Sequence, residues 1–242
     1  MKKSYSPLAA LLLMAFMFVH INVEAQRKIR GNGNVVTEEH KVGSFSELFL
    51  DGVCNIYIDQ GSEEKVVVEA DENLHEYIYV DHSGDRLDID MKSRINIRSR
   101  NKLNIYVTVK DLQRLRIMGV GNVKTDGSLK LDDLKIKVTG VGNVELDVEA
   151  NTLDAEINSV GNITLAGEIN EAEISNKGVG RLDAYDLRLN KLDLNVSGVG
   201  KTEVYVEKEI AVRSTGVGNV HVRGDAVITE LHSSGVGKVK KM

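Results

Sequence analysis

A basic cluster between residues 92 and 102 holds side chains suited to binding an anion. If this stretch is a strand, Arg94 and Arg98 lie on the face opposite Ile95 and Ile97. Guanidinium groups donate paired hydrogen bonds to carboxylates and phosphates, so the cluster indicates a site for an acidic glycan or for the phosphate of lipopolysaccharide. A solvated strand face and loop is the alternative explanation. The candidate anion-binding residues are Arg94, Arg98 and Arg100.

Two tyrosines occupy equivalent places in a repeated phrase described below. Tyr185 and Tyr205 follow the start of two successive repeats by the same number of residues. Aromatic rings in register could form a small stacking platform for a sugar ring. The alternative is that both rings pack on an outer sheet.

Several carboxylates also recur at equivalent repeat positions, which is the pattern that a polysaccharide-cleaving site would need. Carboxylates one repeat apart could bind a cation or act as an acid/base pair. However, acidic residues fill many outward positions of this chain, so we interpret them as a solvated outer face and predict no catalytic residue. One such set is Asp126 and Asp147, seven residues after the start of the phrase, and another is Glu173 and Asp193, five residues before it, with Glu156 three residues before it.

The sequence predicts neither a metal site nor a cofactor. His221 and His232 fall at different repeat positions, and no third ligand stands at a recognisable spacing from them. The Gly-Val-Gly phrases recur and precede strands, whereas a phosphate-binding loop occurs once and opens a helix.

The elements that carry these residues are set by a repeat. The phrase Gly-Val-Gly-Asn-Val at 119–123 returns at 140–144, as Ser-Val-Gly-Asn-Ile at 159–163, and as Gly-Val-Gly from 178, 198, 216 and 235. A repeat of about 19–20 residues without helical patterning is typical of a unit stacked on copies of itself. The fold class predicted is all-β, a β-helix or β-solenoid with Gly-Val-Gly-Asn corners.

Within each repeat, apolar residues alternate before the phrase, as in Leu115/Ile117 and Ile136/Val138, which indicates a strand with one buried face. The valine of the phrase and the apolar residue three positions after it are expected to stack from repeat to repeat. Glycine fits a sharp corner that needs positive φ or close backbone approach, and stacked asparagines can form an amide ladder. The expected corner residues are Gly121, Asn122, Gly142, Asn143, Gly161, Asn162, Gly180, Gly200, Gly218, Asn219 and Gly237.

The segment before the repeats shows the same alternation in longer strands. Residues 50–58 resemble a degenerate first corner, with Cys54 where the second glycine would stand. No linker separates the two halves, so one domain is expected over residues 43–242, preceded by a lead-in at 26–42. Strands are expected at 46–50, 53–58, 65–69, 86–91 and 102–109.

Residues 1–25 have the features of a signal peptide: Lys2 and Lys3, an apolar run at 8–19, and Val23-Glu-Ala25 as a small-residue cleavage site. The run is short for a membrane span, so no transmembrane segment is expected after cleavage. We therefore predict an exported protein of the periplasm or cell surface. Its formal charge of −5 makes nucleic acid a poor partner, and the lone Cys54 excludes an intrachain disulfide.

Taken together and in order, five segments resemble the putative auto-transporter adhesin, head GIN domain family, over residues 43–225. The resemblance implies a β-helix-like, exported protein that forms homo-oligomers, and it supplies no motif of binding residues. The segments are 45–61, 66–74, 87–91, 103–109 and the Gly-Val-Gly-Asn corners.

The function expected is therefore non-enzymatic binding of a glycan, or of an envelope or host macromolecule, on a repetitive surface. Many weak contacts along the repeats would supply the affinity. Two alternatives remain open: a structural envelope protein that binds itself, and a polysaccharide-active β-helix enzyme.

Overall fold

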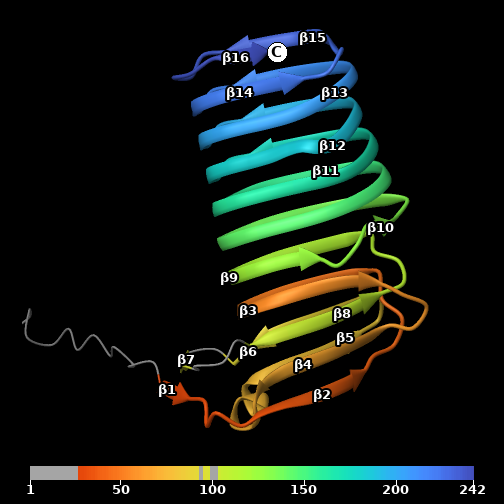
Figure 1. Ribbon diagram of the computed structural model, residues 1–242, viewed down its shortest axis with the longest axis vertical. Helices are drawn as coiled ribbons and strands as arrows, with labels where there is room; N and C mark the ends of the chain where they lie inside the picture. Colours follow the sequence, from red (N-terminus) through yellow and green to blue (C-terminus); the bar gives the residue numbers. More distant parts are fainter. Residues whose placement is uncertain (1–26, 93–94, 99–102) are drawn as a thin grey trace, which may run out of the picture.

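The computed structural model describes residues 27–92, 95–98 and 103–242 (Figure 1). Strands make up 78 % of these residues and one 3₁₀ helix 3 %, which confirms the predicted all-β class. The strands are β1 (Arg27–Arg30), β2 (Val35–Lys41), β3 (Glu47–Gln60), β4 (Lys65–Asp71), β5 (Ile78–Ser83), β6 (Arg86–Met91), β7 (Ile95–Arg98), β8 (Asn104–Val109), β9 (Arg114–Thr125), β10 (Leu129–Lys130), β11 (Asp133–Asn176), β12 (Val179–Val196), β13 (Val199–Ser214), β14 (Val217–Arg223), β15 (Val227–Ser233) and β16 (Val239–Lys241), with the helix η1 at Glu72–Tyr77.

The strands form a 14-stranded mixed sheet with the central order β16-β14-β13-β12-β11-β9-β3-β8-β4-β2. From β3 to β16 successive repeats pair in parallel and in register, so that Gly142 lies beside Gly121 and Gly180 beside Gly161. Figure 1 shows these strands as a stack that rises toward the C-terminus. Around the corners, each repeat therefore places its residues directly beside the equivalent residues of the next.

The N-terminal end of the stack is not purely parallel. Strand β4 pairs antiparallel with both β2 and β8, and β5 pairs antiparallel with β6. Strands β1 and β7 form a separate two-stranded parallel sheet. The two strands expected at 46–50 and 53–58 are one strand, β3, which runs through the degenerate corner.

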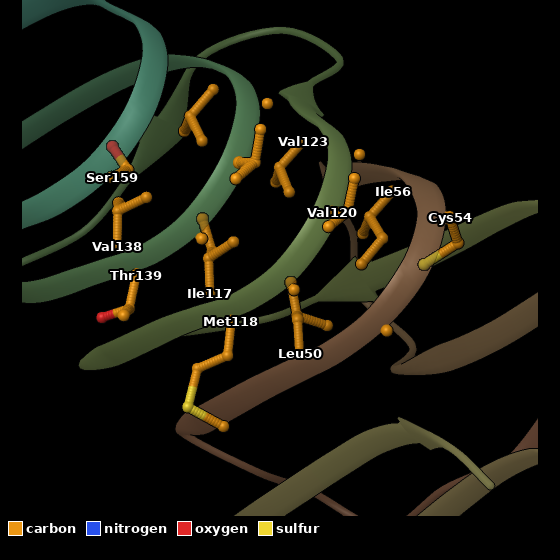
Figure 2. A pocket seen from close by; sticks show the side chains of 17 residues that line it. Leu50, Cys54, Ile56, Ile117, Met118, Val120, Val123, Val138, Thr139 and Ser159 are labelled. Atoms are coloured by element: carbon orange, nitrogen blue, oxygen red, sulfur yellow. The ribbon is translucent and has the colours of Figure 1, made fainter. Parts of the chain in front are cut away.

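The core consists of the alternating apolar side chains on the inner side of the stack. Leu115, Ile136 and Val138 are buried, as are Val123 and Val144 after the corner. Figure 2 shows Leu50, Ile117 and Val138 on adjacent strands, and their Cα atoms are paired across those strands. The stacked aliphatic side chains thus take the place of a conventional two-layer core.

The glycine corners are positions where a side chain cannot fit. Gly142 has φ +152°, and a Cβ there would lie 1.7 Å from the carbonyl oxygen of Gly121. The equivalent place in β3 holds Cys54, which is half-buried and pairs with Gly121 of β9.

The valines of the repeated phrase stack as expected, but they are not core residues. Eight of them form what we call the valine column, and 49–72 % of each is exposed. Side chains two positions apart on a strand point to the same face, so each valine faces outward together with the residue at the asparagine position that follows it. The valine column consists of Val53, Val120, Val141, Val160, Val179, Val199, Val217 and Val236.

Within the described residues, no helix is long and apolar enough to cross a membrane.

Candidate functional site

A chain of side-chain amides crosses the outer face of five stacked strand segments. The Nδ2 group of each asparagine donates to the Oδ1 atom of the next, over distances of 3.0 to 3.2 Å. At the lower end the Nδ2 group of Asn104 donates to the Glu69 carboxylate over 2.7 Å. We call this set the amide ladder: Asn162, Asn143, Asn122, Asn55 and Asn104.

The ladder leaves half of the hydrogen-bonding capacity of each inner amide unused. A carboxamide carries two N–H donors and two acceptor lone pairs. Asn122 and Asn143 each spend one donor and one lone pair within the ladder, and both side chains are exposed. Each such repeat therefore offers one N–H and one lone pair outward, at a spacing of roughly 4.8 Å along the stack.

Two tyrosines stack at the lower end of the ladder. The rings of Tyr57 and Tyr106 lie 5.1 Å apart between centroids, with planes inclined by 16°. The Tyr106 hydroxyl donates to the Glu69 carboxylate over 3.2 Å. Burial and the Glu69 charge raise the pKa of Tyr106, so its hydroxyl stays protonated as a donor. This pair is an aromatic surface next to free amides.

Sequence reasoning missed this pair, although the signal was present. Asn55-Ile-Tyr57 and Asn104-Ile-Tyr106 are the same tripeptide, and β3 and β8 pair in parallel with the two copies in register.

The outer face is hollowed beside the ladder. Two cavities of about 300 and 310 Å³ both border Asn143 and Glu145, so they are neighbours along the ladder, and we call the two together the ladder groove. One wall is the row of asparagines, and the other is the row two residues later in each strand. The lining includes Tyr57, Lys124, Glu145, Thr164, Arg181 and Asp183.

The upper end of the groove is closed by charged pairs. Arg181 replaces asparagine in the ladder position, and it contacts Asp183 at 2.8 Å and Glu203 at 2.6 Å. Lys201, which occupies the same position in the next repeat, contacts Glu203 at 2.7 Å. Burial opposes ionisation of Glu203, but Lys201 and Arg181 outweigh it and hold the pKa of that carboxyl below its usual value.

The repeats and this fold can be compared with known proteins. The family model described as "Putative auto-transporter adhesin, head GIN domain", a domain of unknown function, matches residues 44–226. The chain belongs to this family. No curated protein matches it.

Solved structures of similar proteins carry the same fold. A putative adhesin from Bacteroides fragilis superposes with a TM-score of 0.84 at 28 % identity, over 88 % of this chain and 100 % of that one. A putative lipid binding protein from Parabacteroides distasonis gives 0.70 at 24 % identity, over 88 % and 100 %. A putative adhesin from the same species gives 0.68 at 22 % identity, over 89 % and 100 %. The last two resemblances establish the fold alone.

In this head GIN domain, the two tyrosines singled out from the sequence do not face each other. Strand β12 shifts register after Ala184, so that Tyr205 pairs with Arg188 instead of Tyr185. The Arg223 guanidinium lies 3.8 Å from the centre of the Tyr185 ring. A sugar platform built from both rings remains a prediction, and the bulge after Ala184 separates its two members.

The basic cluster is described in part. Arg94 and Arg100 lie outside the described residues. Arg98 is exposed at the end of β7, where it pairs with Arg30 of β1. Lys28 is exposed on the same strand as Arg30, so the structure adds two cations to this face that the sequence reasoning did not include. Their signal was the alternation that Arg27-Lys-Ile-Arg30 shares with Ile95-Asn-Ile-Arg98.

The stacked carboxylates do not converge on a reactive centre. Glu173 and Asp193 are in register, whereas Glu156 is held by Lys137 at 2.7 Å and Lys177 at 3.7 Å. The hydrogen bond from Lys137 lowers the pKa of Glu156. No group of three metal-ligating side chains occurs in the described part of the chain.

A cavity inside the stack lies beneath the first glycine corners (Figure 2). Its volume is about 30 Å³, and Leu50, Cys54, Ile117 and Val138 are among its lining residues. That volume has room for one or two water molecules and is too small for a sugar. The candidate site is therefore the ladder groove on the outer face.

Proposed function

We propose that this chain is a β-solenoid binding protein without catalytic activity, and that it holds a glycan in the ladder groove. The observation that carries the proposal is the amide ladder, which presents one free donor and one free acceptor in successive repeats. A sugar carries neighbouring hydroxyls that both donate and accept, so its hydroxyls can bond to the free donor and the free acceptor of each repeat. The Tyr57 and Tyr106 rings add an apolar surface for the C–H face of a sugar.

Export to the periplasm or cell surface is part of this proposal. The signal-peptide pattern in residues 1–25 and membership of an adhesin family support it. Digestion of intact cells with an impermeant protease tests the location. Loss of the protein while periplasmic markers survive supports the surface, and protection until the cells are permeabilised supports the periplasm.

A glycan microarray probed with the purified protein tests the binding function, with Tyr106→Ala as the variant. Loss of an aromatic contact is expected to weaken capture about three- to tenfold. Tyr79→Ala is the matched control, because Tyr79 is 40 % exposed on β5 and Tyr106 is 39 % exposed on β8. A panel of neutral and acidic glycans on which nothing is captured would refute the function.

The valine column favours a second candidate function, self-association in an envelope structure. Its eight half-exposed valines are aligned along the stack, and exposed apolar rows of this kind mark protein interfaces. Val179→Lys should then abolish a concentration-dependent dimer in sedimentation equilibrium, whereas Val227→Lys, outside the column, should not. A wild-type protein that stays monomeric at millimolar concentration would remove this candidate.

A polysaccharide-active enzyme is the third reading, and reducing-end assays on a polysaccharide panel test it. Product release by the wild-type protein would support it over binding alone.

A further inference from the structure

We infer that the ligand of the ladder groove is a neutral, linear polysaccharide that lies across the strands, parallel to the direction in which the repeats stack. This inference rests on the proposed function and adds the length, direction and charge of the glycan. Three features of the groove carry it: its repetition, its ends and its balanced charges.

Repetition sets the direction of the ligand. Asn55, Asn122, Asn143 and Asn162 stand on successive stacked strand segments, and each pair is joined by one hydrogen bond. A chain that runs along this row meets an equivalent amide at every step of roughly 4.8 Å. A chain that runs along one strand would meet a single amide. A ligand with its own repeat is therefore the one that can use the whole row.

The two ends of the groove set the length. Tyr57 lines the lower end and stacks on Tyr106 of the next strand, so a terminal sugar ring can rest on an aromatic surface there. At the upper end the amide row stops at Arg181, whose guanidinium is already engaged by two carboxylates. Four strand steps separate Asn55 from Arg181, about 19 Å in all. With one sugar unit per strand, the groove accepts about five units.

Balanced charges select a neutral ligand. Lys124 contacts Glu145 at 3.6 Å, and Arg181 contacts Asp183 and Glu203. An acidic sugar would have to displace these carboxylates from their cations, and it would meet Glu145 and Asp183 as like charges in the groove lining. A neutral sugar keeps the pairs intact and needs the amides alone.

Titration calorimetry with oligosaccharides of one to eight units tests the inference. The probes are the β-1,4-linked glucan, xylan and mannan series, with oligogalacturonides as the acidic series. For at least one neutral series we expect affinity to rise at least tenfold from two to five units and then to level off. Equal affinity for one unit and for five, or a preference for the acidic series, would overturn the inference. If no glycan binds here or on the microarray, the proposed function itself fails.

Two variants tie the result to the groove. Asn143→Ala removes the middle amide and should weaken binding of the five-unit probe about three- to tenfold, as expected for one or two lost hydrogen bonds. Asn170→Ala is the matched control. Asn170 is also the middle member of a row of hydrogen-bonded asparagines, between Asn151 and Asn190, but this row lies outside the ladder groove. Equal losses in both variants, or none with Asn143→Ala, would contradict the assignment.

A further variant tests whether the charged pairs of the groove disfavour an acidic glycan. Glu145→Gln frees Lys124 and should improve binding of the acidic probe severalfold relative to the neutral probe. An unchanged ratio of the two affinities in this variant would overturn charge selection by the groove. Residual acidic binding to the wild-type protein should be lost in the double variant Arg30→Glu/Arg98→Glu, which places that binding on β1 and β7; acidic binding that survives there would count against charge selection by the groove.

Discussion

Replacement of Gly142 by alanine tests the stacking geometry on which the groove depends. Gly142 has φ +152°, and its added Cβ would lie 1.7 Å from the Gly121 carbonyl oxygen. Ordinary van der Waals contact begins at 3.4 Å, so the two repeats would have to move apart by about 1.7 Å. That separation would break the hydrogen bond from Asn143 to Asn122, now 3.1 Å, and weaken the adjacent backbone pairing.

The cost has two parts. A non-glycine residue in this backbone region costs about 1–3 kcal/mol. Two or three hydrogen bonds lost from the paired strands add about 1 kcal/mol each. The sum, about 3–6 kcal/mol, is a large share of the 5–15 kcal/mol by which a domain of this kind is stable.

Gly127→Ala separates the two parts. Gly127 has φ +90°, but no atom lies within 4 Å of its would-be Cβ, so this variant carries the backbone term without the clash. Urea unfolding followed by circular dichroism should show Gly142→Ala to be less stable than Gly127→Ala by about 2–3 kcal/mol. Equal losses of stability in Gly142→Ala and Gly127→Ala would mean that neighbouring repeats are not in contact at the corner. The explanation of the amide ladder by close backbone approach would then be wrong.

Two further predictions follow from titratable groups. Because Lys201 and Arg181 lower the pKa of Glu203 from 4.5, its ionised form stabilises the fold above that pH, and the contribution is lost as pH falls through the lower folded value. Glu203→Gln should therefore be less stable than wild type at pH 7, and the gap in urea midpoint should close on acidification; a pH-independent gap would contradict this. Burial raises the pKa of the Cys54 thiol to about 12, so at pH 8 a disulfide reagent should modify native protein far more slowly than urea-unfolded protein. Equal rates in the two states would show that the thiol is not shielded.

The period of the sequence was enough to predict the all-β class, because a fixed interval without helical patterning leaves few other solutions. It also predicted which glycines and asparagines would be neighbours, since equivalent positions of stacked repeats must lie side by side. A strand was expected at 65–69, within β4, but its antiparallel pairing with β2 and β8 could not be predicted in this way, because these strands lie outside the repeat and are distant in sequence.

The residues of the candidate site were harder to predict for two physical reasons. Tyr57 and Tyr106 are 49 residues apart in sequence and meet because β8 pairs with β3, for which the shared Asn-Ile-Tyr tripeptide was the signal. Tyr185 and Tyr205 follow the start of their phrases by the same number of residues, which would place them side by side in an unbroken register. The bulge after Ala184 breaks that register. The valines of the column were correctly predicted to stack, but their exposure to solvent was not predicted. Alternation shows which residues of a strand share a face, and it does not show which of the two faces is buried.

The corner glycines and the amide ladder are two consequences of one constraint. Backbones that approach closely enough to exclude a Cβ at Gly142 also hold Asn143 one strand spacing from Asn122, which lets the amides bond directly over 3.1 Å. A surface built this way is periodic by construction, which is why the proposed ligand is a periodic one. The length of the site is then set by where asparagine gives way to another residue. In this chain that residue is Arg181, and because Glu203 and Asp183 neutralise it, the row ends without creating an anion site.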